Sequence, residues 1–209
     1  EKSNVTDQIY YWDWNCLENL EEIIRYFEPD YLVNLAAYHH SSSNLKTDFD
    51  YQDKMFNVNL NGLRIIIEAI LKTNNSCSLI NAASSQIFTA CKDIELVSEE
   101  TIHNPSTLYG VYKSAGIKLT NFFKEYYKLK VSNLIFFNHE SEFRSDRFVS
   151  RLITKTSAEI KMGISNNLHL RNIGACADFS SAYDFMQAIR LICEKNTFED
   201  FILASGHGT

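Results

Sequence analysis

The chain has 209 residues, 45% of them hydrophobic, which is enough for one substantial core and leaves little room for a second full domain. Its formal net charge of −6 argues against nucleic acid or an anionic membrane surface as partners. No apolar run is long enough to cross a bilayer and no signal-peptide pattern opens the chain, so we expect a soluble, cytoplasmic protein.

The five cysteines are scattered along the chain, without a C-x-x-C pair and without histidines at metal-ligand spacing. This pattern favours reduced thiols over a disulfide framework, and it predicts no metal site.

Strand-like apolar runs alternate with helix-like apolar spacing along the whole chain. In chain order, we predict a strand at 8–12, a helix at 17–27, a strand at 31–37, a helix at 56–70, a strand at 78–83, an irregular polar stretch at 84–105, a helix at 109–127, a strand at 131–137, a helix at 148–162, a strand at 168–170, a helix at 182–193 and a strand at 201–204. This alternation predicts right-handed βαβ units. We therefore expect an α/β fold, a Rossmann-like, doubly wound parallel sheet in three α/β/α layers.

Ligands of such sheets bind at the carboxyl ends of the strands, so the residues that follow each apolar run are candidates for a site. They are Asp13, residues 36–40, residues 84–86 and residues 138–144.

Tyr109 and Lys113 lie four residues apart near the start of a predicted helix, and therefore on the same face of it. A nearby ammonium favours the phenolate, which lowers the pKa of the phenol and makes Tyr109 a usable proton acceptor. Alone, the pair also fits an ordinary helix surface.

Ser84 and Ser85 end a predicted buried strand that would face the same crevice as Tyr109. A hydroxyl there can bind the oxygen of an alcohol or ketone while the phenolate moves its proton, as hydride transfer to or from a nicotinamide requires. The alternative is that these serines only cap the strand.

Several short motifs together carry a resemblance to a known family. They are Asn-Leu-Ala-Ala at 34–37, Ser-Ser-Gln at 84–86, the Tyr109 and Lys113 pair, Asn-His-Glu-Ser at 138–141 with Arg144, and Phe-Val-Ser-Arg at 148–151. From about Asp13 to Ser205 the chain resembles the extended short-chain dehydrogenase/reductase family, and within it the GDP-mannose 4,6-dehydratases.

The resemblance implies a bound NADP or NAD and assigns residues to it. Asp13 would contact the adenine, the backbone of Leu35, Ala36 and Ala37 would lie along the cofactor, and His139 and Arg144 would approach it. Ser84, Tyr109 and Lys113 would be catalytic, with Tyr109 as the base and Lys113 also holding the nicotinamide ribose.

The implied substrate is a nucleotide sugar, GDP-linked by this likeness, oxidised at C4. Residues expected to bind it are His40, Ser85, Asn138, Phe148, Val149 and Arg151. The family also implies a homo-oligomer, to which an apolar stripe of Leu60, Leu63 and Ile67 would contribute unless it packs on the sheet. We treat residues 1–209 as one partial nucleotide-binding domain, with the substrate portion beginning near residue 139.

Two departures from the family pattern concern catalysis and substrate binding. Gln86 stands where the dehydratases have the glutamate that removes the C5 proton, and an amide is no such base. Ala177 and Phe143 replace arginines suited to phosphate. A C4 epimerase, a 4-dehydrogenase and a catalytically silent nucleotide-binding subunit are therefore alternatives to a dehydratase.

A third departure is the glycine-rich turn that holds the pyrophosphate, because no glycine precedes Gly62. Either that turn lies outside this chain, which we favour, or the dinucleotide is held in another way.

Overall fold

The computed structural model describes residues 10, 12–13, 16–39, 49–73, 76–89, 96–170, 174 and 176–208. These residues contain a four-stranded sheet in the order β1 (Tyr31–Asn34), β2 (Ser78–Ser84), β3 (Val131–Phe136), β6 (Phe201–Leu203). Every neighbouring pair is parallel. The predicted α/β class is thereby confirmed.

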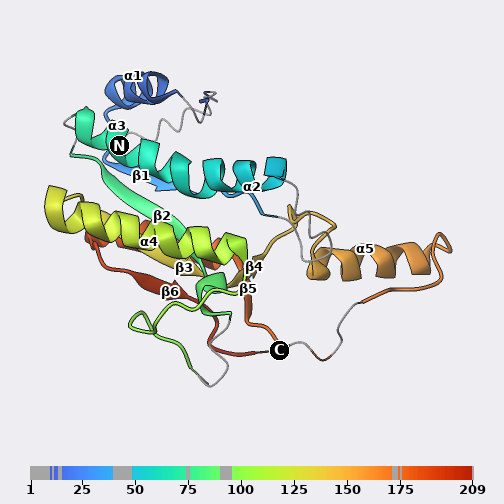
Figure 1. Ribbon diagram of the computed structural model, residues 1–209. Coiled ribbons are helices and arrows are strands. Elements are labelled where there is room, and N and C mark those ends of the chain that lie inside the picture. Colours follow the sequence, from blue (N-terminus) through green and yellow to red (C-terminus); the bar gives the residue numbers. More distant parts are fainter. Residues whose placement is uncertain are drawn as a thin grey trace.

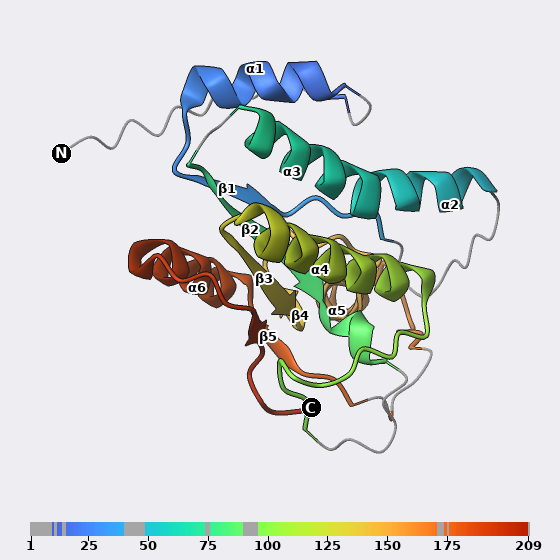
Figure 2. The same cartoon turned by 60° about the vertical axis from the view of Figure 1, so that its left-hand side comes forward.

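Helices cover the sheet on both faces (Figure 1). On one face lie α3 (Gly62–Lys72) and α4 (Leu108–Tyr127), with α1 (Leu17–Phe27) packed against α3; α6 (Ala182–Lys195) lies on the other face, as the turned view shows (Figure 2). Side chains alternate between these layers: Leu79 packs with α1 and α3, whereas the next residue, Ile80, packs with α6. Strands buried on both faces explain the continuous apolar runs of the sequence.

The helix before β2 begins earlier than the predicted start at residue 56. It comprises α2 (Phe49–Phe56), a π-helical turn at Asn57–Asn61 and then α3. The buried side chain of Asn59 accepts a hydrogen bond from Tyr38 N at 3.2 Å and donates to Tyr38 O at 2.9 Å. The early turns were missed because α2 buries little, only Met55 being buried, and so lacks a strong apolar stripe.

Two of three predicted strands differ from the structure, and the other is not tested by it. The first, at 8–12, lies largely outside the described residues. The second ends at Asn34 instead of residue 37, and the segment at 168–170 is irregular, being too short a run of apolar residues to specify a strand. A second, two-stranded sheet of β4 (Asn138–Glu140) and β5 (Phe179–Ser181) was missed because both strands are largely polar.

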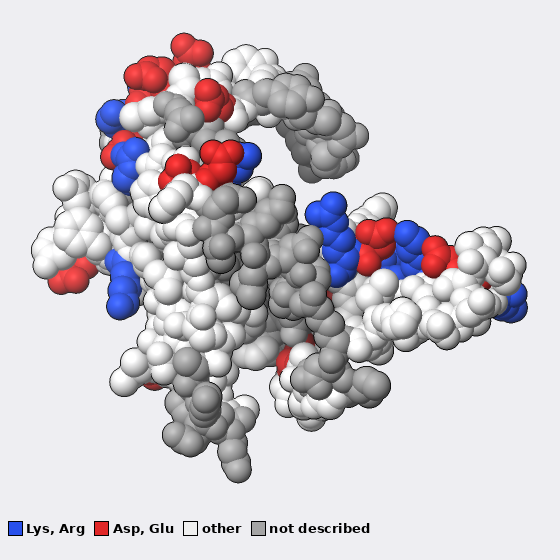
Figure 3. All heavy atoms as spheres, turned by 45° about the vertical axis from the view of Figure 1, so that its right-hand side comes forward, with Lys and Arg blue, Asp and Glu red and all other residues white. Residues whose placement is uncertain are grey.

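The helix α5 (Val149–Lys161) projects from the body of the molecule (Figures 1 and 3). Thr156 is its one buried residue, and its charged residues are the basic Arg151, Lys155 and Lys161 and the acidic Glu159. Among the described helices, none is both long enough and apolar enough to span a membrane.

Candidate functional site

Ser84 lies at the carboxyl end of β2, where the chain turns into a short 3-10 helix at Ser85–Phe88. Its hydroxyl caps this turn by accepting a hydrogen bond from Gln86 N at 3.3 Å. The serine thus has the strand-capping role considered above, but its position at the sheet edge leaves it beside the start of α4.

Tyr109 is the second residue of α4, which begins after its N-cap, Thr107, where the Thr107 hydroxyl accepts a hydrogen bond from Gly110 N at 3.0 Å. The helix approaches the 3-10 turn very closely at Gly110. A Cβ on Gly110 would lie 2.4 Å from the carbonyl oxygen of Gln86. The absence of a side chain at this position therefore sets the approach of Tyr109 to Ser84.

The three groups predicted to be catalytic come together in the fold. The Ser84 side chain is close enough to Tyr109 to lower the pKa of its phenol. The Nζ atom of Lys113 lies 5.7 Å from the centroid of the Tyr109 ring and donates to the carbonyl oxygen of Ala82 at 2.7 Å. Hydroxyl, phenol and amine, from β2 and α4, share one small region.

Burial controls the charges of this cluster. It raises the pKa of Tyr109 to about 12, although the Ser84 side chain and the positive charge of Arg144 act in the opposite direction. Burial also lowers the pKa of Lys113 to about 8. The expected depression of the Tyr109 pKa by Lys113 is therefore wrong for the protein without ligands, because loss of hydration outweighs the neighbouring charges.

His39 is a neighbour of Tyr109 that the sequence indicated only weakly. Its ring centroid lies 4.4 Å from that of Tyr109, with the ring planes 62° apart. Its position just beyond a strand end was the available signal, but paired histidines in a loop are common. His40, proposed for the substrate, lies outside the described residues.

Of the residues assigned to the cofactor, four lie beside β1 and α1. Leu35, Ala36 and Ala37 follow β1 directly, with Leu35 and Ala37 exposed and Ala36 half-buried. Asp13 is an exposed residue just before α1. The open edge at residues 35–37 is compatible with an extended ligand lying along the backbone.

Arg144 is held by two neighbours. Its Nε lies 3.3 Å from a carboxylate oxygen of Glu140, and its guanidinium carbon lies 3.5 Å from the centroid of the Phe148 ring. Because its charge lowers the pKa of Tyr109, Arg144 is within electrostatic reach of the cluster.

Asn138 and His139 make contacts with protein groups. The amide of Asn138 donates to Asp178 O at 3.0 Å, and His139 Nδ1 lies 3.0 Å from Phe137 O. The His139 ring also packs against Phe136 and Phe185, at 5.3 and 5.0 Å between centroids. In this arrangement His139 belongs to an aromatic cluster with α6, and not to the Tyr109 cluster.

Gln86 has its side chain close to the start of α4. Its Oε1 accepts a hydrogen bond from the Thr107 hydroxyl at 3.3 Å. Ser85, beside it, is half-buried. Position 86 therefore faces the same end of α4 as Tyr109, as a C5 base would require.

The remaining positions lie toward the outer part of the molecule. Val149 and Arg151 are exposed on the first turn of α5. Phe143 is 89% exposed, and Ala177 is half-buried. The Phe143 ring is apolar, so it provides no group that could bind a phosphate.

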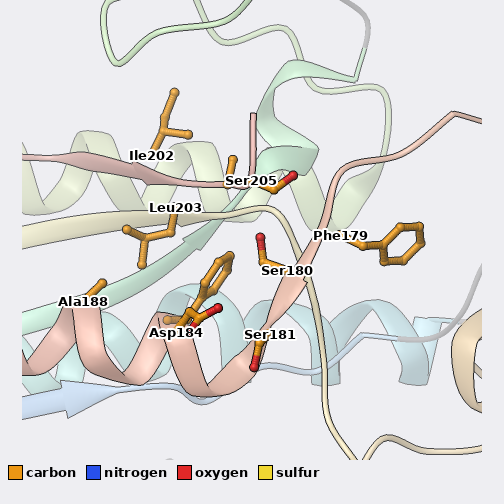
Figure 4. Close-up of a pocket in the computed structure, with 10 residues that line it drawn as sticks. Phe179, Ser180, Ser181, Asp184, Ala188, Ile202, Leu203 and Ser205 are labelled. Carbon is orange, nitrogen blue, oxygen red and sulfur yellow. The ribbon is translucent and has the colours of Figure 1, made fainter. Parts of the chain in front are cut away.

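A cavity of about 490 Å³ lies where β5, α6 and the end of β6 meet (Figure 4). Its lining combines phenylalanine and aliphatic side chains with serines and Asp184, including Ser180 and Ser205. None of the Ser84, Tyr109 and Lys113 cluster lines it, so it is a separate feature.

A second hollow, of about 460 Å³, lies on the outer side of α3 and α4. We call it the α3–α4 groove; its lining residues are Phe56, Leu60, Asn61, Arg64, Ala115, Lys118, Leu119 and Phe122. Leu60, Leu63 and Ile67 form the apolar stripe that was expected to contribute to a homo-oligomer. Of these three, Leu60 lines the groove, whereas Leu63 and Ile67 are buried in the core. Helix-on-sheet packing accounts for the other two.

The family model described as GDP-mannose 4,6 dehydratase matches residues 2–209. Among curated relatives, GDP-mannose 4,6 dehydratase 2 of Arabidopsis thaliana is 29% identical over 205 residues, covering 96% of this chain and 53% of the relative. The GDP-mannose 4,6 dehydratase of Dictyostelium discoideum is 31% identical over 212 residues, covering 99% and 56%. This chain thus spans about half the length of these relatives.

Solved structures share the fold. RMD from Pseudomonas aeruginosa, complexed with NADPH, superimposes with a TM-score of 0.85 at 20% identity, over 96% of this chain and 68% of that one. The UDP-glucose 4-epimerase of Thermus thermophilus, in complex with NAD, gives a TM-score of 0.78 at 19% identity, over 95% and 63%. At these identities the likeness concerns the fold.

Proposed function

We propose a function from the premise that this chain belongs to the GDP-mannose 4,6-dehydratase family, whose members are nucleotide-sugar-modifying enzymes. The full protein oxidises the C4 hydroxyl of a nucleotide sugar, GDP-linked by its relatives, and uses NADP or NAD as the hydride acceptor. The observation that carries the proposal is the meeting of Ser84, Tyr109 and Lys113 at the carboxyl edge of the sheet.

Each of the three side chains has a part in moving the proton. Ser84, which lies beside Tyr109, orients the sugar oxygen, and Tyr109 receives the proton of the sugar hydroxyl. Lys113 has its amine fixed by Ala82 O and supplies positive charge near the phenol when it is protonated. Since the Tyr109 phenol is neutral near pH 7 in the free protein, ligand binding has to favour the phenolate before it acts.

The described residues offer contacts to both ends of a dinucleotide. The accessible edge at Leu35–Ala37 and the Tyr109 and Lys113 pair suit the nicotinamide end, and Asp13 is exposed for the adenine. When bound, the cofactor accepts or returns a hydride. His39 lies against Tyr109 and narrows the space around the phenol.

A C4 epimerase or 4-dehydrogenase is the second candidate, and Gln86 favours it. Both activities need oxidation and reduction at C4 and no C5 base. The Gln86 side chain lies close to the start of α4. The dehydratases have a glutamate at this position, and an amide accepts no proton near neutral pH. Elimination of water is therefore expected to be slow.

Replacing Gln86 tests this assignment. In the full protein with GDP-mannose and NADP, we expect the reduced nicotinamide to form but little 4-keto-6-deoxy sugar to accumulate. Gln86→Glu should raise the dehydration rate by about 100-fold, a typical contribution of a positioned general base, as measured by mass spectrometry of the product. Gln86→Met, of similar length, is the control and should give no increase.

A 4-keto-6-deoxy product formed by the unchanged protein at an ordinary rate would show that another base replaces residue 86. Absence of cofactor reduction with GDP-mannose and with other nucleotide sugars, in a folded protein, would favour the catalytically silent alternative.

We also propose that the full protein forms a homo-oligomer through the α3–α4 groove. Phe56 and Phe122 are 42% and 49% exposed there, although large aromatic side chains are costly to leave in water. A second copy related by a two-fold axis would bring the same apolar surface against it.

A further inference from the structure

A chain of buried amides crosses the sheet from β6 to the segment that follows β1. Asn34, Asn81 and Asn133 occupy the same register on β1, β2 and β3 and are 7%, 3% and 0% exposed. Asn34 Nδ2 donates to Asn81 Oδ1 at 3.0 Å, and Asn81 Nδ2 donates to Asn133 Oδ1 at 2.9 Å. We call this series, with Asp200, the asparagine ladder.

Asp200 ends the ladder on the β6 side. One of its carboxylate oxygens accepts hydrogen bonds from Asn133 N at 2.9 Å and from Asn133 Nδ2 at 3.0 Å. At the other end, Asn34 Oδ1 accepts a hydrogen bond from Ala36 N at 3.3 Å. The ladder therefore connects a carboxylate on one side of the sheet to the backbone of the segment at residues 35–37.

The carboxylate determines which way every amide points. A carboxylate only accepts hydrogen bonds, so Asn133 must present its NH2 group to Asp200 and its oxygen to Asn81. Asn81 must then present its oxygen to Asn34, and the oxygen of Asn34 is left facing Ala36 N–H. Each amide has a donor nitrogen and an acceptor oxygen. The orientation of one amide therefore determines the orientation of the next, without any movement of the backbone.

The helix that carries the catalytic pair also joins the ladder. The hydroxyl of Thr120 on α4 is completely buried, and its single hydrogen is shared between Ile117 O at 2.8 Å and Asn133 Oδ1 at 3.0 Å. Hydrogen-bonded chains of this kind strengthen one another in a low-dielectric interior, and an unmatched member is costly.

We infer that Asp200 is a positioning residue that, through the asparagine ladder, fixes the backbone at Leu35–Ala37 for binding of the nicotinamide dinucleotide. The assignment of this segment to the cofactor rests on the proposed function. Apolar side chains would fill the middle of a parallel sheet with no need for matched polar partners, so a fully bonded amide chain favours a role in orientation.

Hydrogen exchange in the full protein without ligand tests the ladder first. Asp200 is only half-buried, so water can reach the groups that Asp200→Ala leaves, and the variant should fold. Exchange at Ala36 N–H should become about 10-fold faster. Asp200 and Ala36 are three strand spacings apart, about 14 Å in all. Without the ladder between them, a change at Asp200 should not alter exchange at Ala36.

Two control variants separate orientation from general destabilisation. Asp200→Asn keeps an acceptor oxygen and should retain the slow exchange at Ala36. Ser132→Ala removes a buried hydrogen bond from the neighbouring residue of β3, Ser132 Oγ to Thr197 O at 3.0 Å, but leaves the ladder intact. It should also retain slow exchange. If Asp200→Ala does not fold, Asn81→Leu, which cuts the ladder mid-sheet, takes its place and should accelerate the same amide.

Cofactor binding is the second readout. In Asp200→Ala the Kd for NADPH should rise about 10-fold, whereas Asp200→Asn and Ser132→Ala stay within about two-fold of the original protein. Unchanged exchange at Ala36, or equal acceleration in Ser132→Ala, would overturn the ladder as a relay; accelerated exchange with an unchanged Kd would overturn its positioning role. If the original protein binds no NADPH, the proposed function fails, while the exchange data still decide the relay.

Discussion

Burial disfavours the charged forms of Lys113 and Tyr109, so near pH 7 the phenol is neutral whereas the amine is still largely protonated. The pKa of Lys113 lies near 8 and that of Tyr109 near 12. A cofactor or substrate that brings charge or hydrogen bonds into the site changes both values. Under the proposed function, Tyr109 therefore becomes a proton acceptor only when cofactor or substrate is bound.

The titration of Lys113 is open to measurement through stability. Between about pH 8 and its ordinary pKa of 10.5, the unfolded chain holds the Lys113 proton and the folded chain does not. The free energy of unfolding should therefore rise with pH in this window, by at most about 1.4 kcal/mol per pH unit. Lys113→Met should lose this rise in urea denaturation at several pH values.

The difference in unfolding free energy between the original protein and Lys113→Met, taken at each pH, isolates the contribution of Lys113. Cys77, for example, has its pKa raised to about 11 by burial and contributes a fall in stability between about pH 9 and 11 in both proteins. Parallel stability curves for the lysine and methionine proteins would contradict a depressed Lys113 pKa.

At the scale of elements, α4 serves two surfaces at once. Its first turn approaches the 3-10 turn after β2 so closely that Gly110 leaves no room for a side chain, and this brings Tyr109 to Ser84. Farther along, its outer side forms the α3–α4 groove with Phe56 and Leu60. The proposed catalytic geometry and the proposed interface therefore depend on the same helix.

Charge placed in the groove should separate the proposed oligomer. Arg64 and Lys118 already line the groove, so the double change Phe56→Lys and Phe122→Lys brings further positive charges together in a two-fold interface. We expect at least about a 100-fold weaker self-association, measured by sedimentation equilibrium of the full protein.

The control for this experiment is Phe49→Lys. Phe49 is 83% exposed at the start of α2 and does not line the groove, so the same chemical change should leave the mass unaltered. A monomeric original protein, or an oligomer that survives the double change, would contradict the assigned surface.

At the scale of the whole molecule, the sequence predicted the strands and helices whose apolar runs are long. The buried strands at 78–84 and 131–136 and the helix at 108–127 agree with prediction within about a residue at each end. The polar strands β4 and β5 carry no apolar signal, and β1 ends at Asn34, whose side chain donates to Asn81, a residue 47 positions away. Long-range polar contacts of this kind are not visible in a local pattern.

The same limit applies to the site. The spacing of Tyr109 and Lys113, and a serine at a strand end, were sufficient to predict their meeting. The direction of the pKa shifts was not predictable, because it depends on how deeply the cluster is buried. The contacts of Asn138 and His139 with protein groups depend on β5 and α6, which follow later in the chain.

The central claim is that Tyr109 takes the proton of the sugar hydroxyl during hydride transfer. Its most direct test is single-turnover reduction of the nicotinamide in the full protein, with Tyr109→Phe compared to Tyr112→Phe, a change on the same helix at a ring that packs against Phe56. We expect the rate of nicotinamide reduction to fall at least about 100-fold in Tyr109→Phe, with cofactor binding retained, and not to fall in Tyr112→Phe. Hydride transfer at the original rate in Tyr109→Phe would contradict the central claim.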